Sequence, residues 1–434
     1  MEFSLSETIS NLTVIEVIAL SIVGAVLFFI ALSKRIHILT FMLVLSASLV
    51  GSTIPLVNNI AALVRWISLF LLLIVVVARW KFKVSLRLLP FWGYVFLGLV
   101  FLLDAISLDW QLQRGILLLV VAVTIPFAYG GETYRSLKSS LVLISLAATI
   151  YSLLNFISLP SHLSEATRFS GYSEVAASFA MVLGGLLPFT FWGLWKANDR
   201  AIRIACGSGF LFGLITLLFS GQRAGAVGGA IGLTPLLLML LQQKNIGKFV
   251  SVVTLASLLG YILVQQSSGD WADFLWMRYS VDHGLSGREW IWREALSEIH
   301  DNPLLGRGIG AAETVIQGSF HNAYLEIWFN TGLVGLLLFL TSQVYFIYRI
   351  LYLKRVSEDP ETRSILALAL GYMMGFVAMC MVESPAAGAS NLNLMLYIFL
   401  GVVVSSNQLV NLAEPPKSRP PLPHYRPLEI HRHP

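Results

Sequence analysis

The chain has 434 residues, of which 56% are hydrophobic and 12% are charged, and its mean hydropathy is +0.75. About a quarter of the residues in a soluble globular domain are charged, so this composition excludes a protein whose whole surface faces water. We expect membrane lipids to be its main solvent and partners. The formal net charge of +5 is small for a chain of this length, and we expect no nucleic-acid partner.

Thirteen apolar runs approach the roughly 20 residues that a helix needs to cross a bilayer. They fall at about 13–33, 38–57, 60–78, 88–107, 115–130, 139–159, 174–195, 204–220, 224–242, 249–266, 323–350, 364–383 and 392–410. Very short connections divide the runs within 38–78 and 204–242, so twelve spans is the alternative. We predict an all-α polytopic membrane protein with 12–13 transmembrane helices in one domain, residues 1–413. A disordered cytoplasmic tail follows at 414–434.

Basic residues are concentrated in alternate loops. One set holds 21 of the 29 lysines and arginines: residues 34 and 35; 79, 81, 83 and 87; 135 and 138; 196, 200 and 203; 244 and 248; 349, 354, 355 and 363; and 417, 419, 426 and 432. Cytoplasmic loops carry such an excess, so we predict that this set faces the cytoplasm.

The eight remaining basic residues are all arginines, and they are predicted outside the membrane or at outer helix ends. They are Arg65, Arg114, Arg168, Arg223, Arg278, Arg288, Arg293 and Arg307. Arginine keeps its charge and presents a planar fork of donors that suits phosphate oxygens, so one hypothesis is an anionic ligand. The alternative is ion pairing with outer acids, for which the candidates are Asp270, Asp273, Asp282 and Glu313.

The longest polar stretch, about 267–322, is predicted to be one large, partly helical outer loop, and loops of this size usually have a function. Trp292, Ala295 and Ile299 in this loop share one face at helical spacing, which predicts a short amphipathic helix at the outer interface. Pro303 should end it. The glycines of residues 302–310 permit a turn whose amides bind an anion, although many ordinary loops look the same.

Two further residues are candidates for chemistry. His321 lies at the outer mouth of a predicted span beside the arginine-bearing loop, a position that suits a general base, although a lone histidine is more often structural. Arg223 lies in a very short outer turn, where an arginine is costly unless it has a partner. Cys206 and Cys380 lie within apolar runs and are predicted to be buried thiols. No CxxC or HExxH spacing occurs, so we expect neither a metal nor a cofactor.

The ordered motifs resemble the O-antigen ligase and Wzy-type O-antigen polymerase superfamily of bacterial lipid-linked glycan transferases. The motifs are Arg168-x-x-Gly171, Ser220-x-x-Arg223-x-Gly225, Ser286-Gly287-Arg288-x-x-x-Trp292, Asn302-Pro303-Leu304-x-Gly306-x-Gly308 and His321-Asn322-x-Tyr324-Leu325, followed by Thr331-Gly332-Leu333-x-Gly335. The resemblance covers about residues 165–340. The chain departs from the family where Gly171 leads into Tyr172 and where Gly221 and Gln222 separate Ser220 from Arg223.

The resemblance implies a GT-C-like membrane glycosyltransferase in the bacterial inner membrane, with its active site and large outer loop in the periplasm. The donor would be a glycan on undecaprenyl diphosphate, and the acceptor a lipid A core or a growing glycan. Arg168, Arg223 and Arg288 would bind the diphosphate, and His321 and Arg288 would be catalytic. Supporting roles would fall to Asn322, Tyr324 and Ser286. The reaction would be metal-independent and inverting.

Two alternatives remain open. A Wzy-type polymerase, which joins repeat units, would share these motifs, and one dominant histidine-bearing outer loop only slightly favours a ligase. A polysaccharide or lipid transporter would typically show internal repeats and polar residues near the midplane, whereas this chain has no clear repeat and its charges gather at one outer end.

Overall fold

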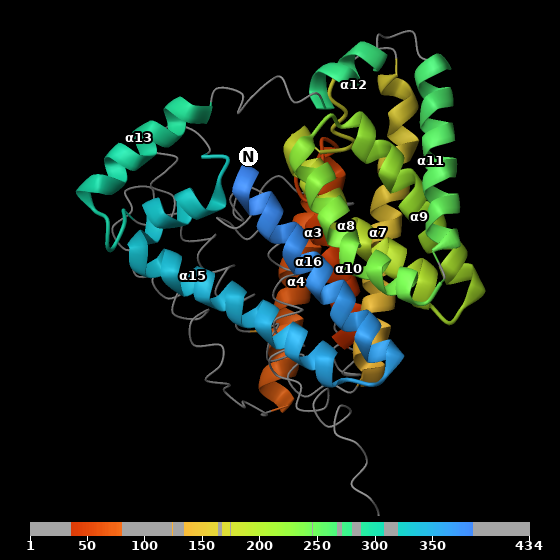
Figure 1. The fold of residues 1–434 in the computed structure, drawn as a ribbon, viewed down its shortest axis with the longest axis horizontal. Helices are drawn as coiled ribbons and strands as arrows, with labels where there is room; N and C mark the ends of the chain where they lie inside the picture. The colour runs from red at the N-terminus through yellow and green to blue at the C-terminus, as the bar shows by residue number, and fades with distance from the viewer. Residues whose placement is uncertain are drawn as a thin grey trace, which may run out of the picture.

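The computed structural model describes residues 36–79, 124, 134–163, 167–173, 175–244, 246–266, 271–279, 288–307 and 320–384. Regular structure in these ranges is helical apart from one isolated bridge between Ser52 and Ser173. Figure 1 shows a bundle of long helices. The helices are α3 (Ile36–Leu49), α4 (Pro55–Arg79), α7 (Tyr134–Ser158), the 3-10 helix η3 (Leu159–His162), α8 (Ala176–Lys196), α9 (Arg200–Phe219), α10 (Arg223–Gln242), α11 (Gly247–Gln266), α12 (Trp271–Tyr279), α13 (Arg288–Asp301), α15 (Ala323–Val356) and α16 (Pro360–Val382).

Seven helices in the described ranges are long and apolar enough to cross a membrane: α4, α7, α8, α9, α10, α15 and α16. The shorter apolar helices α3 and α11 also lie where spans were predicted, so the prediction of a polytopic helical membrane protein is confirmed. The predicted spans at 13–33, 88–107, 115–130 and 392–410, and the predicted tail at 414–434, lie outside the described residues. The total of twelve or thirteen spans therefore stays a prediction.

One predicted boundary was wrong. The division between the second and third spans was placed at 57–60, whereas α3 ends at Leu49 and α4 begins at Pro55. The physical reason is Pro55 itself, because proline lacks an amide hydrogen and fits the first turn of a helix better than its interior.

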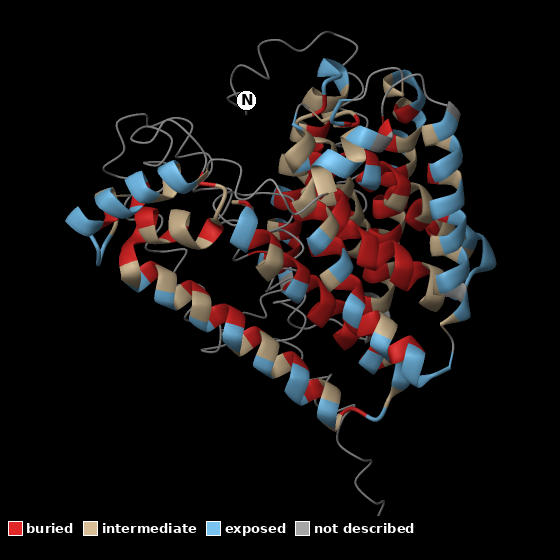
Figure 2. Ribbon diagram, turned by 45° about the horizontal axis from the view of Figure 1, so that its top comes forward, coloured by how far each residue is buried: buried red, intermediate tan, exposed pale blue. Residues whose placement is uncertain are grey.

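The centre of the bundle consists of α8, α10 and α16, and buried residues are concentrated there in Figure 2. Their backbones approach closely where glycines face each other. A Cβ on Gly184 would lie 2.2 Å from the carbonyl oxygen of Gly225, and one on Gly371 would lie 2.0 Å from that of Gly232. Small residues at helix interfaces permit such packing in membranes. The close packing of α8, α10 and α16 thus fixes the positions of their outer ends.

Helix α15 is broken at Gly332, whose φ of 67° and ψ of −177° are not helical. The hydroxyl of Tyr324 donates to Oε1 of Gln343 at 3.2 Å, across 19 positions of sequence. In a straight helix those positions would be about 28 Å apart, more than the two side chains can bridge. The span predicted over 323–350 is therefore bent, because residues 323–331 fold back on the longer segment that follows Gly332.

Residues 288–307 and 320–331 form an outer unit with a small hydrophobic core of its own. Ala295 and Ile299 of α13 are buried there against Phe320 and Phe329, and the other face of α13 is exposed. The predicted amphipathic helix is confirmed. It ends at Asp301, two residues before Pro303. Figure 1 shows α13 and the first part of α15 to one side of the central helices.

The described part of the glycine-rich turn closes the break in α15. The amide of Leu333 donates to the carbonyl oxygen of Pro303 at 2.8 Å, and that of Arg307 donates to the carbonyl oxygen of Phe329 at 2.9 Å. A Cβ on Gly332 would lie 2.1 Å from the carbonyl oxygen of Leu304. The amides of Arg307 and Leu333 thus satisfy carbonyls inside the outer unit, and residues 308–310 lie outside the described ranges.

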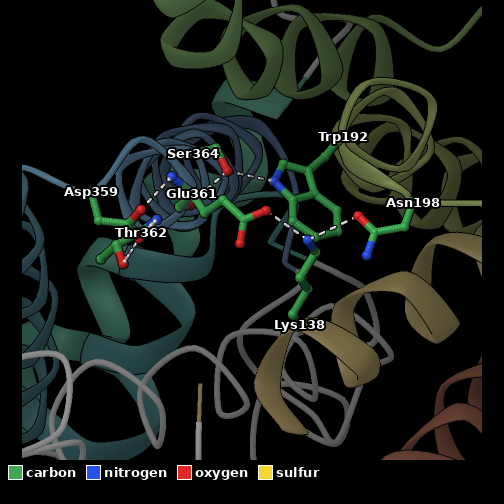
Figure 3. Close-up of polar contacts among 7 residues, drawn as sticks. All are labelled: Lys138, Trp192, Asn198, Asp359, Glu361, Thr362 and Ser364. Atoms are coloured by element: carbon green, nitrogen blue, oxygen red, sulfur yellow. Dashed lines mark hydrogen bonds and ion pairs between the residues drawn. The ribbon is translucent and has the colours of Figure 1, made fainter. Parts of the chain in front are cut away.

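Helix ends that were predicted to share the cytoplasmic side meet at one end of the bundle (Figure 3). Nζ of Lys138, near the start of α7, lies 2.7 Å from Oε1 of Glu361 at the start of α16 and 3.2 Å from Oδ1 of Asn198 between α8 and α9. Ser364 of α16 accepts a hydrogen bond from the indole of Trp192 in α8 at 3.3 Å. The arrangement agrees with the alternation of loops derived from the basic residues.

Candidate functional site

Among the residues that the structure describes, one acid is buried, Glu383, and it lies at the opposite end of the bundle. Glu383 follows the last residue of α16 and is 4% exposed. Its Oε1 lies 3.0 Å from Nη2 of Arg288, and its Oε2 lies 2.8 Å from Nδ1 of His321. Nη1 of Arg288 also donates to the carbonyl oxygen of Val382. A buried charge is tolerated when it is paired and hydrogen-bonded, and here the partners are two residues of the sequence motifs.

Neighbouring residues hold the backbone at His321 in place. The backbone of His321 is in the left-handed region, with φ of 50°. The preceding Phe320 is buried, and its carbonyl oxygen accepts the indole hydrogen of Trp292 at 2.7 Å. The following Asn322 caps α15, since its Oδ1 accepts from the amide of Leu325 at 3.0 Å. The backbone that carries the His321 ring is therefore held by contacts of the residues on either side of it.

The amide of Ala323 ties the start of α15 directly to the end of α16, donating to the carbonyl oxygen of Glu383 at 3.0 Å. Nδ2 of Asn322 donates to the carbonyl oxygen of Met381 at 3.3 Å. Both the side chain and the backbone of the Glu383 segment thus contact the His321 segment.

Arg168 lies in a loop that is held against the outer ends of the helices. The amide of Phe169 donates to the carbonyl oxygen of Phe219 at 3.3 Å, and the amide of Tyr172 donates to Oδ1 of the buried Asn155 at 2.9 Å. Gly171 has φ of 60°, and a Cβ there would overlap Asn155. The Arg168-x-x-Gly171 motif thus needs glycine both for its backbone conformation and for lack of space.

The electrostatics of Arg168 connect it to the Glu383 cluster. Desolvation by neighbouring atoms lowers the pKa of the Arg168 guanidinium below its ordinary value, and the charges of Arg278 and Arg288 lower it further. Glu383 acts in the opposite direction. Arg168 thus lies within electrostatic range of all three residues, in a field where positive charge outweighs the one carboxylate.

Arg223 is the first residue of α10, and its Nε donates to the carbonyl oxygen of Arg278 at 2.7 Å. This contact explains how an arginine fits so tight a turn: α12 lies against the turn and supplies an acceptor. A Cβ on Gly221 would lie 3.2 Å from Cγ of Arg278. The predicted partner requirement of Arg223 is met by backbone rather than by an acid.

Two predicted site residues, Arg288 and His321, thus contact Glu383. Arg168 lies within electrostatic range of Glu383, and Arg223 lies beside Arg278. Asn322 supports the site as a helix cap. Tyr324 directs its hydroxyl to Gln343, so its contact maintains the bend of α15. Ser286 lies outside the described residues.

Sequence reasoning missed Glu383. Of the four acids proposed as ion-pair partners, Asp273 is described and exposed, and the other three lie outside the described residues. The described partner of Arg288 is Glu383. The sequence did contain an indication of Glu383, because it is the first charged residue after Arg363. An acid at the end of an apolar span is costly unless it is paired or functional. Its partners could not be named, since they lie 95 and 62 positions earlier.

Comparison with known families agrees with this geometry. Residues 208–340 match the family model described as O-antigen ligase. This segment is just under a third of the chain and contains Arg223, Arg278, Arg288 and His321, but neither Arg168 nor Glu383. A search of the curated proteins found no match. Residues 208–340 are therefore similar to the O-antigen ligase family, and the match supports a membrane role in glycan transfer during O-antigen processing.

Proposed function

We propose that the protein transfers a glycan from undecaprenyl diphosphate to a sugar hydroxyl of an acceptor at the periplasmic face of the bacterial inner membrane, as an O-antigen ligase does. The observation that carries the proposal is the contact of Arg288 and His321 with the two oxygens of the Glu383 carboxylate. One group suited to bind phosphate and one suited to accept a proton thus lie side by side, as glycosyl transfer from a diphosphate requires.

His321 is the proposed general base. Contact of Nδ1 with a buried carboxylate favours the tautomer in which Nδ1 carries the hydrogen, because the carboxylate can only accept while it is ionised. Nε2 is then the basic nitrogen, to which we assign the acceptor hydroxyl. The carboxylate also stabilises the positive ring that forms when the proton arrives.

The bonds balance in a single displacement. The acceptor oxygen attacks the anomeric carbon of the donor while its proton passes to Nε2 of His321. The bond from the anomeric carbon to the diphosphate oxygen breaks, and its electron pair leaves with undecaprenyl diphosphate. Attack opposite the leaving group inverts the anomeric centre. Arg168, Arg223 and Arg288 bind the diphosphate and stabilise the charge that develops on it.

Substitution of Arg288 and His321 tests the mechanism. Purified protein in nanodiscs is incubated with lipid-linked repeat units, with and without lipid A core, and products are separated on gels. His321→Ala and Arg288→Ala should each lower transfer at least about 100-fold without loss of folding. The exposed Glu294→Gln on α13 serves as the control. Full transfer in both alanine variants would overturn the mechanism.

The product identifies the acceptor. A ligase yields glycan on lipid A core and requires that acceptor, whereas a Wzy-type polymerase lengthens the lipid-linked glycan in its absence. Elongation without core would replace the ligase assignment by the polymerase and keep the site. Unchanged glycan with net movement of the lipid between leaflets would favour the transporter instead.

A further inference from the structure

Helix α12 is fixed firmly on the outer end of the bundle. Its first residue, Trp271, is buried, lies 4.8 Å from Phe219 between ring centroids, and donates to the carbonyl oxygen of Leu163 at 3.0 Å. Its last residue, Tyr279, lies with its hydroxyl 3.2 Å from the carbonyl oxygen of Leu218. Burial raises the pKa of Tyr279 to about 12, so this hydroxyl remains a donor. Because both ends of α12 are held, the backbone of Arg278, next to Tyr279, has a defined position.

Arg278 packs against an aromatic ring and has a buried nitrogen, unlike an arginine on a solvated surface. Its guanidinium lies 5.5 Å from the ring centroid of Phe274, an arrangement that orients the charge. Its Nε is buried and makes no hydrogen bond to any residue that the structure describes. A buried donor of this kind is costly unless a ligand or an ordered water accepts its hydrogen.

The charges around Arg278 indicate what kind of ligand. The charges of Arg278 and Arg288 both lower the pKa of Arg168, and Glu383 is the one acid among the groups that change this pKa. Arginines stay charged and cannot relieve their repulsion by losing a proton. An anion with more than one negative charge would offset this excess.

We propose that Arg278 binds the diphosphate of the donor as a fourth arginine of the site, from the side of α12. The assignment rests on the proposed function and extends it. Arg288 belongs to the outer unit, whereas Arg168 and Arg278 belong to segments packed on the bundle, so the anion lies between the two. A group with two phosphates can engage both sides at once.

The experiment compares diphosphate with monophosphate. Farnesyl diphosphate and farnesyl monophosphate are titrated by calorimetry into the full chain in nanodiscs. Arg278→Gln should weaken diphosphate binding at least about tenfold and monophosphate binding less than about threefold, because the lost charge is the one that the second phosphate needs. Arg278→Lys should restore part of the difference. The substitution leaves the contact of Arg223 intact, since its acceptor is the backbone of residue 278.

Two further variants separate binding from folding. Arg278→Met keeps the apolar packing on Phe274 and should match Arg278→Gln in binding and wild type in thermal unfolding. Arg293→Gln removes the same charge from the exposed face of α13 and should leave both affinities unchanged.

The outcomes distinguish the two proposals. Diphosphate affinity within threefold of wild type in Arg278→Gln, together with a large loss in Arg288→Gln, overturns the role of Arg278 alone. A wild-type protein that does not prefer diphosphate to monophosphate overturns the proposed donor, and the role of Arg278 with it.

Discussion

Nδ1 of His321 lies 2.8 Å from Oε2 of Glu383, and this contact joins the outer unit to the end of α16. His321 is half-exposed, whereas the Glu383 side chain is 6% exposed. The buried acid therefore holds the ring from inside the protein, while the rest of the ring remains partly exposed.

Glu383→Gln is expected to lower the turnover of glycan transfer by about 10- to 100-fold, the range known for carboxylates that orient metal-binding histidines. Glutamine keeps the shape but loses the charge that stabilises a protonated ring. The decrease should appear in kcat more than in KM for the acceptor.

The matched control for Glu383→Gln is Glu289→Gln, which changes an exposed acid next to Arg288 on α13. It should transfer at the wild-type rate. Equal turnover in Glu383→Gln and wild type, with both folded by thermal unfolding, would show that Glu383 has no part in the reaction.

Gly332→Ala should destabilise the protein by at least about 2 kcal/mol and reduce transfer. Alanine is strained at a φ of 67°, and its Cβ would overlap the carbonyl of Leu304. The shift would disturb the break in α15 that brings His321 to Glu383. Thermal unfolding in nanodiscs measures the loss of stability.

Two controls separate the contributions at Gly332. A Cβ on Gly247 meets nothing within 4 Å, so Gly247→Ala should have little effect. Gly51 has a φ of 84° and equal space, so Gly51→Ala should report backbone strain alone. If Gly332→Ala lowered the stability no more than Gly51→Ala does, the overlap with the Leu304 carbonyl would contribute nothing to the loss.

Asp359→Ala should lower stability by about 1 kcal/mol near neutral pH, because Asp359 caps α16. Its Oδ2 accepts from the amide of Thr362 at 2.8 Å and from the hydroxyl of Thr362 at 2.6 Å. Burial acts to raise the pKa of Asp359, but the hydrogen bonds from Thr362 and Glu361 outweigh it and the pKa is lowered.

The sign of the pH dependence follows from that lowered pKa. The ionised cap stabilises the fold above the ordinary aspartate pKa of about 4, and this stabilisation disappears as the pH falls through the lower pKa of the folded state. The difference in unfolding temperature between wild type and Asp359→Ala should therefore shrink in acid. The exposed neighbour Glu358→Ala should show no such difference, and a constant gap at all pH values would contradict the assignment.

The ion pair between Lys138 and Glu361 should contribute less than about 1 kcal/mol. The two side chains are 17% and 46% exposed, and partly exposed pairs are screened by solvent and salt. A double-mutant cycle with Lys138→Met and Glu361→Gln measures the coupling. A coupling of several kcal/mol, or one that does not weaken in high salt, would be inconsistent with this estimate.

Much of the membrane architecture followed from local pattern. A span must be apolar over its whole length, so the runs that became α7 to α11 were visible within a few residues of their true ends. The face of α13 was equally visible, because a helix repeats every 3.6 residues. The break at Gly332 was not, since glycine is common within membrane helices and the bend depends on backbone bonds from Pro303 and Arg307.

Some residues of the candidate site were also predicted from local pattern, whereas others were not. The motifs identified Arg168, Arg223, Arg288 and His321 because unusual residue types stood at outer helix ends. Arg278 was among the eight outer arginines but no motif included it, and Glu383 was missed because its partners lie far away in sequence.

The sequence by itself determined that this is a helical membrane protein, which of its ends carry the basic loops, and which arginines and histidine are exceptional. Each of these follows from composition and short-range spacing, to which lipid and the membrane interface respond directly. Only the tertiary structure decided that Arg288 and His321 share the carboxylate of Glu383 and that Arg223 bonds to the backbone of Arg278. Those contacts join α10, α12, α13 and α16, and the packing that brings separate helices together is a property of the whole chain rather than of any one segment.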